Sequence, residues 1–233
     1  MKKRITFRQF KDLCIIILNM VKLYYTPTSC GASSFISAFI AGINFECEAV
    51  DLATHITESG VNFYNINPKG NVPTLVLDDG TILNENIACL EYILDLSLQN
   101  KKCIKIGSDN NTSDRYILKQ HLSFVATELH PIIGMFFNPS VKSDTYIRKF
   151  LLTIFDKKMK YLESYMIKNK KFIHGDSFTI IDAYLHIVLG WTGYVGIDLN
   201  KYEIALKYKE FIESIPEVKK AKNRMAFFPK TTI

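Results

Sequence analysis

The amino-acid sequence predicts a small α/β domain over residues 21–98, followed by an all-α domain over residues 113–233. Three observations support this prediction. Short apolar runs alternate with helical periodicity in the first region, whereas apolar residues recur at helical spacing in the second. Hydrophobic residues make up 48% of the 233 residues, which is enough to bury a sizeable core. Residues 99–112 lose the periodicity and are interpreted as a linker.

The first elements form a β-α-β unit. Residues 21–26 are a short apolar, aromatic run that ends at Pro27, which is typical of a buried strand. Helical spacing of apolar residues follows over residues 35–40, and Gly42 ends this helix. Residues 45–50 alternate in polarity and predict a half-buried strand. Two strands joined in this way are expected to be parallel, with a right-handed crossover.

A hairpin and a helix follow a polar loop. Residues 74–77 and 81–83 are apolar runs separated by Asp-Asp-Gly, which is a hairpin signal. Asn84 is in a position to cap the next helix. The apolar face of that helix is formed by Ile87, Leu90 and Leu94. The predicted order is therefore β-α-β, a loop, and then β-β-α.

Four helices are predicted in the second domain. The first carries apolar residues at positions 118–129, and the second, starting near Asp144, carries them as far as residue 162. The third begins at Thr179, which forms a predicted capping box with Asp182 three residues later, and we interpret this pair as structural. The fourth ends at Pro216.

Residues 1–20 are interpreted as a dispensable extension. They begin with basic residues, as a signal peptide does, but the apolar run at residues 14–18 is shorter than the roughly 7 residues that a signal peptide needs. The run is also far below the roughly 20 residues of a membrane span. We therefore expect no membrane partner.

The charge pattern argues against nucleic-acid binding. The net charge is +6, from 29 basic and 23 acidic side chains. Much of the excess lies near the two ends of the chain, and no recognition motif accompanies it, so we interpret these residues as solvated surface. Anionic small ligands remain compatible with this charge.

The cysteines indicate a reducing compartment. There are five of them, an odd number, and none forms a CxxC pair. This pattern is typical of a cytoplasmic protein and not of a disulfide framework. Cys47 and Cys89 are interpreted as small core residues because they lie in patterned apolar segments.

Five motifs, in order and at matching spacing, resemble the cytosolic glutathione transferases, most closely the bacterial beta class. They are KLYYTPTSC at 22–30, VDL at 50–52, NPKGNVPTLVLDDGTILNE at 67–85, ATELH at 126–130 and FTIIDAYL at 178–185. The resemblance spans roughly residues 21–218. It implies a thioredoxin-like N-terminal domain and an all-helical C-terminal domain. It also implies a homodimer that acts in detoxification and conjugates glutathione, its co-substrate, to hydrophobic electrophiles without a metal.

Cys30 lies between a strand-like run and a helix. A thiol at a helix N-terminus faces free N–H groups and the positive end of the helix dipole, which should lower its pKa. The alternative is a small residue that only fills a turn. Ser33 stands three positions on, so Cys30 could form a mixed disulfide with glutathione but could not resolve it within the chain. In the family this cysteine touches the glutathione sulfur.

The resemblance also implies a set of glutathione-binding residues. Pro73 would be cis and expose the backbone of Val72 for pairing with the cysteinyl backbone of glutathione, besides turning the chain into a core strand. Glu85 and Asn86 would bind the γ-glutamyl ammonium and carboxylate, unless Glu85 is only a capping residue. His55 stands where relatives often carry a lysine for the glycyl carboxylate. An exposed loop histidine without a role is the alternative.

Two further residues are implied near the sulfur. His130 would help to deprotonate glutathione or hold its thiolate, although a histidine at the end of an apolar helix can also be structural. Trp191 would line the second-substrate pocket, unless it belongs to the core. The leading function is glutathione conjugation. The alternatives are a glutathione-dependent thiol transferase or peroxidase that uses Cys30, and a non-catalytic ligand-binding homologue.

Overall fold

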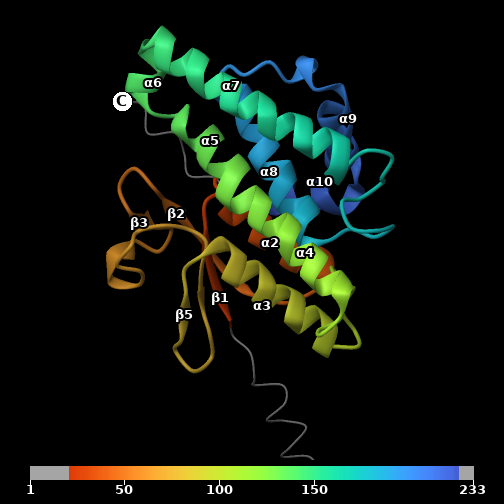
Figure 1. Ribbon diagram of the computed structural model, residues 1–233. Coiled ribbons are helices and arrows are strands. Elements are labelled where there is room, and N and C mark those ends of the chain that lie inside the picture. Colours follow the sequence, from red (N-terminus) through yellow and green to blue (C-terminus); the bar gives the residue numbers. More distant parts are fainter. Residues whose placement is uncertain (1–20, 226–233) are drawn as a thin grey trace, which may run out of the picture.

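A five-stranded sheet lies at one end of the molecule, and helices make up most of the remainder (Figure 1). The computed structural model describes residues 21–225. The strands are β1 (Lys22–Tyr25), β2 (Glu46–Asp51), β3 (Ile56–Thr57), β4 (Thr74–Val76) and β5 (Ile82–Leu83). Their order in the sheet is β3-β2-β1-β4-β5, with β1 and β2 parallel and the other neighbours antiparallel. The predicted β-α-β and β-β-α order is confirmed.

Two helices belong to the sheet region, and the others form the helical part. The first two are α2 (Gly31–Ala41) and α3 (Asn86–Gln99). The rest are α4 (Ser113–Phe124), α5 (His130–Met135), α6 (Pro139–Ser143), α7 (Thr145–Tyr161), α8 (Ile180–Tyr194), α9 (Glu203–Ser214) and α10 (Pro216–Arg224). A π-helical turn, Val125–Leu129, joins α4 to α5. Short 3-10 turns occupy Phe63–Asn65 and Leu199–Lys201.

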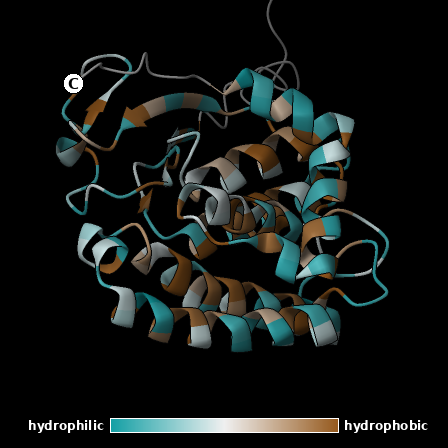
Figure 2. Cartoon of the chain, turned by 90° about the horizontal axis from the view of Figure 1, so that it is seen from above, coloured by the Kyte–Doolittle hydropathy of each residue, from teal (hydrophilic) through white to brown (hydrophobic). Residues whose placement is uncertain are grey.

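The core is continuous from the sheet into the helices. One face of β1 presents Leu23 and Tyr25 to an apolar cluster that extends through Ile36 of α2 to Leu189 of α8. The other face presents Tyr24 to a smaller cluster that contains Phe63. This alternation follows from the two-residue period of a strand. Figure 2 shows the same arrangement, with the most hydrophobic helical residues gathered at the centre.

Three predicted helix boundaries have different outcomes. Gly42 ends α2 with a positive φ of 74°, as predicted, because glycine adopts this left-handed conformation without a steric penalty. Asn84 does not cap α3. Its side chain donates to Asn67 Oδ1 at 3.1 Å, and Glu85 occupies the N-cap position instead. Pro216 does more than end a helix, because it is the first residue of α10, where its missing N–H costs nothing.

The two cysteines that the sequence predicts to be core residues differ in their exposure. Cys89 is fully buried, as predicted. Cys47 is exposed, so that prediction is wrong, because the first two residues of β2 lie outside the core while the next three are buried. The interpreted extension at residues 1–20 lies outside the described residues. Within residues 21–225, no helix combines the length and the apolar character that a membrane crossing requires.

Asp182 is buried at the start of α8 and binds three segments together. Its carboxylate accepts hydrogen bonds from the backbone N–H and the hydroxyl of Thr179, each at 2.7 Å. It also accepts from the Ile173 N–H at 2.9 Å and from the Tyr208 hydroxyl of α9. Four donors therefore converge on one side chain with no exposed surface.

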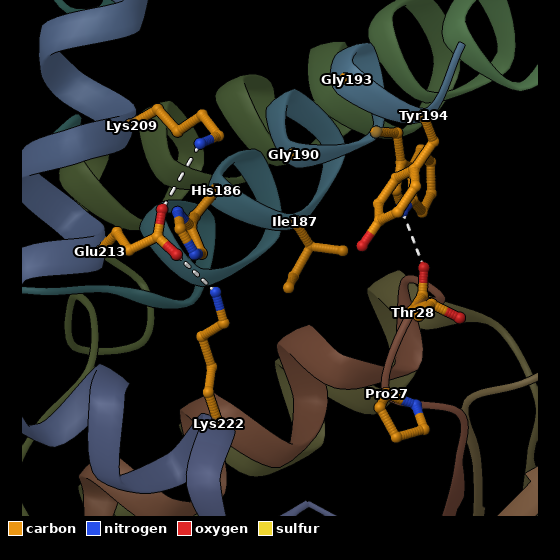
Figure 3. A pocket seen from close by; sticks show the side chains of 11 residues that line it. Pro27, Thr28, His186, Ile187, Gly190, Gly193, Tyr194, Lys209, Glu213 and Lys222 are labelled. Carbon is orange, nitrogen blue, oxygen red and sulfur yellow. Dashed lines mark hydrogen bonds and ion pairs between the residues drawn. The ribbon is translucent and has the colours of Figure 1, made fainter. Parts of the chain in front are cut away.

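An ion cluster between α9 and α10 should make the free energy of unfolding depend on pH in the acidic range. Glu213 lies 2.7 Å from Lys222 Nζ and 3.4 Å from Lys209 Nζ (Figure 3). Its hydrogen bond with Lys222 lowers the pKa of Glu213 from 4.5 to about 2. A carboxyl whose folded pKa is depressed stabilises the fold above its unfolded pKa, and this contribution is lost as the pH falls through the folded value.

We therefore expect Glu213→Gln to be less sensitive than the parent to a change from about pH 6 to about pH 3. The measurement is the urea midpoint at both pH values. Glu210→Gln, an exposed position on the same helix without an ion pair in the described chain, is the matched control. An equal acid sensitivity in Glu213→Gln and in the parent would contradict this prediction.

Candidate functional site

Cys30 lies at the N-cap of α2, beside the turn that leads into β4. Its thiol donates to the Val72 carbonyl oxygen at 3.3 Å. The Val72–Pro73 peptide bond is cis. Within the described chain the Val72 N–H forms no hydrogen bond, so it is free to pair with an extended peptide. The thiol and this backbone group together form one wall of the candidate site.

The pKa of Cys30 differs from the expectation. Burial raises the pKa of the thiol to about 12, and the Glu85 carboxylate adds to this effect. The backbone N–H groups of Cys30 and Gly31 act in the expected direction but do not outweigh burial. The predicted lowering is therefore wrong, and Cys30 is a protonated thiol near neutral pH.

Asn86 joins α2 to the start of α3. Its side chain is buried, and its amide oxygen and amide nitrogen both lie 3.3 Å from the Ser33 hydroxyl, which accepts from the amide N–H and donates its own proton to the Cys30 carbonyl oxygen at 2.6 Å. Ser34 donates to the same amide oxygen, also at 3.3 Å. The amide thus holds two helices together and is not free for a ligand. The first backbone N–H groups of α3 remain available, as they are at any helix N-terminus.

Glu85 is exposed, whereas His55 is half-buried in the same region. Glu85 forms an ion pair with Lys69, a partner that our sequence analysis did not single out, although the motif at residues 67–85 contains it. His55 packs its ring against Tyr64, with ring centroids 4.4 Å apart. Its Nδ1 atom is buried and unpartnered in the described structure.

Gly70 accommodates the pair of rings formed by His55 and Tyr64. A Cβ atom there would lie 2.6 Å from Tyr64 Cε1 and 3.1 Å from the His55 ring, and φ is +65°. Only a residue without a side chain fits this close approach.

His130, the first residue of α5, contacts Tyr184 of α8. His130 Nδ1 lies 2.6 Å from the Tyr184 hydroxyl. Burial lowers the pKa of His130, so its imidazole is neutral near neutral pH. Tyr184 in turn interacts with the Asn86 side chain, which binds the Ser33 hydroxyl of α2. The Tyr184 phenol therefore connects His130, through Asn86 and Ser33, to the start of α2, where Cys30 lies.

Tyr184 was not predicted as a site residue from the sequence. The available signal was its position in the motif at residues 178–185, seven residues before Trp191, which places both side chains on one face of α8. Among residues 21–225, no group of histidine, cysteine, aspartate and glutamate side chains is arranged to hold a metal ion.

Trp191 links the two parts of the molecule. Its indole Nε1 donates to the Thr28 carbonyl oxygen at 2.9 Å, two residues before Cys30. Its ring contacts His130 and Phe137, with centroids 4.7 and 6.2 Å away. Trp191 is 7% exposed, so it is a core residue that also lies against His130.

Comparison with known proteins identifies the family. The family model of the glutathione S-transferase N-terminal domain matches residues 35–96, and that of the C-terminal domain matches residues 128–230. Glutathione S-transferase GstA of Escherichia coli O157:H7 is 33% identical over 201 residues, 86% of this chain and 96% of that protein. The chain belongs to the glutathione S-transferase family, a family of transferases, and the resemblance is confirmed.

Solved structures confirm the architecture. A glutathione transferase from Methylococcus capsulatus is 37% identical, with a TM-score of 0.79, and the match covers 87% of this chain and 97% of that one. A beta-class enzyme from Sphingomonas chungbukensis is 32% identical, with a TM-score of 0.77 and the same coverage. A sphingomonad glutathione S-transferase complexed with glutathione also covers 97% of its chain and 87% of this one, at 32% identity and a TM-score of 0.78.

Proposed function

We propose that the protein conjugates glutathione to hydrophobic electrophiles, with the glutathione sulfur held between Cys30 and His130. One observation carries this proposal. Tyr184 binds His130 and the Asn86 side chain, and Asn86 in turn binds Ser33, whose hydroxyl donates to the Cys30 carbonyl oxygen. A sulfur atom that enters between His130 and Cys30 would meet the Cys30 thiol and the neutral imidazole.

Both groups can stabilise a thiolate as hydrogen-bond donors. If the Tyr184 hydroxyl donates to His130 Nδ1, the proton of the neutral ring is on Nε2, which becomes a donor. The Cys30 thiol is protonated, and its single S–H would donate to the thiolate by turning away from the Val72 carbonyl oxygen. Hydrogen bonds to an ionised acceptor are roughly twice as strong as neutral ones. The glutathione thiol would lose its proton to solvent, and its sulfur would then bond to the electrophilic carbon as the leaving group departs.

The remaining contacts would orient the tripeptide. The free Val72 N–H would pair with the cysteinyl carbonyl of glutathione. Glu85 would bind the γ-glutamyl ammonium, while the N–H groups at the start of α3 and Lys69 would bind its carboxylate. His55 would lie near the glycyl carboxylate. The Asn86 side chain acts here through Ser33 and Tyr184, and not as a direct ligand.

The protonated state of Cys30 favours conjugation over thiol transfer. In thiol transfer the cysteine thiolate must attack a disulfide, and a pKa near 12 leaves little thiolate at neutral pH. In conjugation the nucleophile is the sulfur of glutathione itself, and Cys30 needs only to donate a hydrogen bond.

The electrophile and the partner chain are also part of this proposal. Phe137 is 50% exposed and offers apolar ring surface for a hydrophobic electrophile, and Trp191 supports it from the core next to His130. Family membership supports a homodimer in the cytoplasm. Large exposed side chains on α4 and α7, among them Tyr116, Tyr146 and Phe150, support the dimer.

The test is glutathione binding and conjugation of an aryl halide by the parent, Cys30→Ala and His130→Ala. We expect His130→Ala to lower kcat/KM by about 10- to 100-fold, as the loss of a thiolate donor should. Cys30→Ala should retain most of the activity. Disulfide reduction that disappears in Cys30→Ala, together with feeble conjugation in all three proteins, would establish thiol transfer instead. A parent that neither binds glutathione nor turns over would be a non-catalytic binding protein.

A further inference from the structure

Asn67 is the centre of a buried hydrogen-bond network beside the candidate site. Its side chain has no exposed surface. The amide oxygen accepts from the Lys69 backbone N–H and from the Asn84 amide, each at 3.1 Å. The amide nitrogen lies 2.8 Å from the Asn71 carbonyl oxygen and 3.0 Å from the Thr74 hydroxyl. Because a backbone N–H can only donate, the Lys69 contact fixes which end of the Asn67 amide is the oxygen.

This network shapes the loop at residues 68–73, which contains no helix or strand. Among the backbone N–H groups of these residues, only that of Gly70 donates to another backbone group in the described chain, to the Asn67 carbonyl oxygen at 2.8 Å. The Asn67 side chain contacts Lys69 near the start of the loop and Thr74 directly after it. The conformation of the loop therefore depends on side-chain hydrogen bonds, and Asn67 supplies those at both ends.

The network also connects this loop to the start of α3. The Asn84 amide donates to Asn67, and the Asn84 carbonyl oxygen accepts from the Asn71 amide at 2.9 Å. The next residue is Glu85, the N-cap of α3, which forms an ion pair with Lys69 of the loop. Both side chains of this ion pair are exposed, so it contributes little by itself. The hydrogen bonds of Asn67 and Asn71 therefore carry the connection.

The two sides of the connection hold groups that would bind different parts of glutathione. The Val72 N–H, on the loop, would pair with the cysteinyl residue, and Glu85, at the helix, would bind the γ-glutamyl ammonium. One tripeptide can contact both groups only if the spacing between loop and helix matches it. A loop without a fixed position would have to be ordered by the ligand, and this cost lowers affinity.

We propose that Asn67 is a positioning residue for glutathione, which holds the Val72 N–H and Glu85 at the spacing of the cysteinyl and γ-glutamyl groups. This inference rests on the proposed function. Asn67 does not touch the ligand, because it acts through the loop and through Asn84. The contacts that it positions are remote from the reacting sulfur and are the same before and in the transition state. Their loss should therefore raise KM for glutathione and leave kcat nearly unchanged.

The test compares the parent with Asn67→Ala, Asn84→Ala and Asn100→Ala in glutathione conjugation. We expect Asn67→Ala to raise KM for glutathione by about tenfold or more, because several contacts are lost. Asn84→Ala removes one donor and keeps the carbonyl contact, so it should raise KM by about three- to tenfold. In both variants kcat should stay within about twofold of the parent. Asn100→Ala is the matched control, since the exposed Asn100 side chain accepts from the Lys102 N–H outside the site.

A second readout tests the spacing itself. Inhibition of the reaction is measured with S-hexylglutathione and with S-hexyl-cysteinylglycine, which lacks the γ-glutamyl group. The parent should prefer S-hexylglutathione, and this preference should fall in Asn67→Ala and Asn84→Ala because the γ-glutamyl contacts are no longer in register with the cysteinyl contacts. A merely structural role would lower the amount of folded enzyme without changing KM or the ratio of the two inhibition constants.

Three results would contradict the inference in different ways. If Asn67→Ala and Asn84→Ala keep the KM and the inhibitor ratio of the parent, the inference is overturned while the proposed function stands. A higher KM with an unchanged ratio also overturns it, because the spacing is then not what Asn67 controls. A parent that does not conjugate glutathione overturns the proposed function and this inference together. If Asn67→Ala does not fold, the same two readouts on Asn84→Ala, at a half-buried position, decide the outcome.

Discussion

Replacing Asp182 with alanine is expected to lower the free energy of unfolding by about 3–5 kcal/mol. The carboxylate has no exposed surface and accepts hydrogen bonds from Ile173, Thr179 and Tyr208. Removal leaves several buried donors without an acceptor and opens a cavity at the start of α8. The measurement is urea unfolding near pH 7, with all variants at one protein concentration because the proposed dimer would make stability depend on concentration.

Two milder variants apportion this effect. Tyr208→Phe removes one donor and keeps the ring, so it should cost about 1–2 kcal/mol. Thr179→Ser keeps both the hydroxyl and the backbone N–H, and should cost less than Tyr208→Phe. A loss below about 1 kcal/mol in Asp182→Ala would show that solvent or neighbouring groups satisfy the released donors.

Tyr184→Phe is expected to lower kcat/KM for glutathione conjugation by about tenfold, the effect of losing a hydrogen bond worth about 1.4 kcal/mol. The Tyr184 hydroxyl lies 2.6 Å from His130 Nδ1, so its loss frees the imidazole to turn or to change tautomer. The glutathione thiolate then loses a positioned donor. The pH profile of kcat/KM should shift to higher pH, because the thiolate is less stabilised.

Tyr208→Phe is the matched control for this prediction. It makes the same chemical change on a buried tyrosine, but Tyr208 contacts Asp182 and not the Cys30 wall. It should therefore leave the pH profile unchanged even if it lowers stability. If both variants lose activity equally and neither shifts the profile, Tyr184 has only a structural role.

Helix boundaries illustrate what local pattern can and cannot predict. Gly42 was predictable because a left-handed residue is a local requirement of a helix end. The prediction that Asn84 caps α3 was wrong, because Asn67, 17 residues earlier in the chain, binds its side chain instead. Pro216 is ambiguous by itself, since proline is equally suited to follow one helix and to begin the next.

The candidate site also contains residues that local motifs predict and residues that only the fold brings together. The motifs predicted Cys30, Val72 and His130 because each follows a local pattern at a recognisable spacing. They did not predict Tyr184 as the link, because α2, α3 and α8 meet only in the folded chain. The environment of Asn86 was equally hidden, since Ser33 and Ser34 reach it from another helix.

The sequence by itself determined the order of the main strands and the long helices, the family and the type of chemistry, because periodicity and motif spacing are properties of neighbouring residues. It did not predict the short elements β3, α5, α6 and α10. Only the tertiary structure decided the protonation of Cys30 and the position of Tyr184. The reason is electrostatic and geometric: the helix N-terminus favours a thiolate in every such sequence, but burial opposes it, and burial depends on the whole fold.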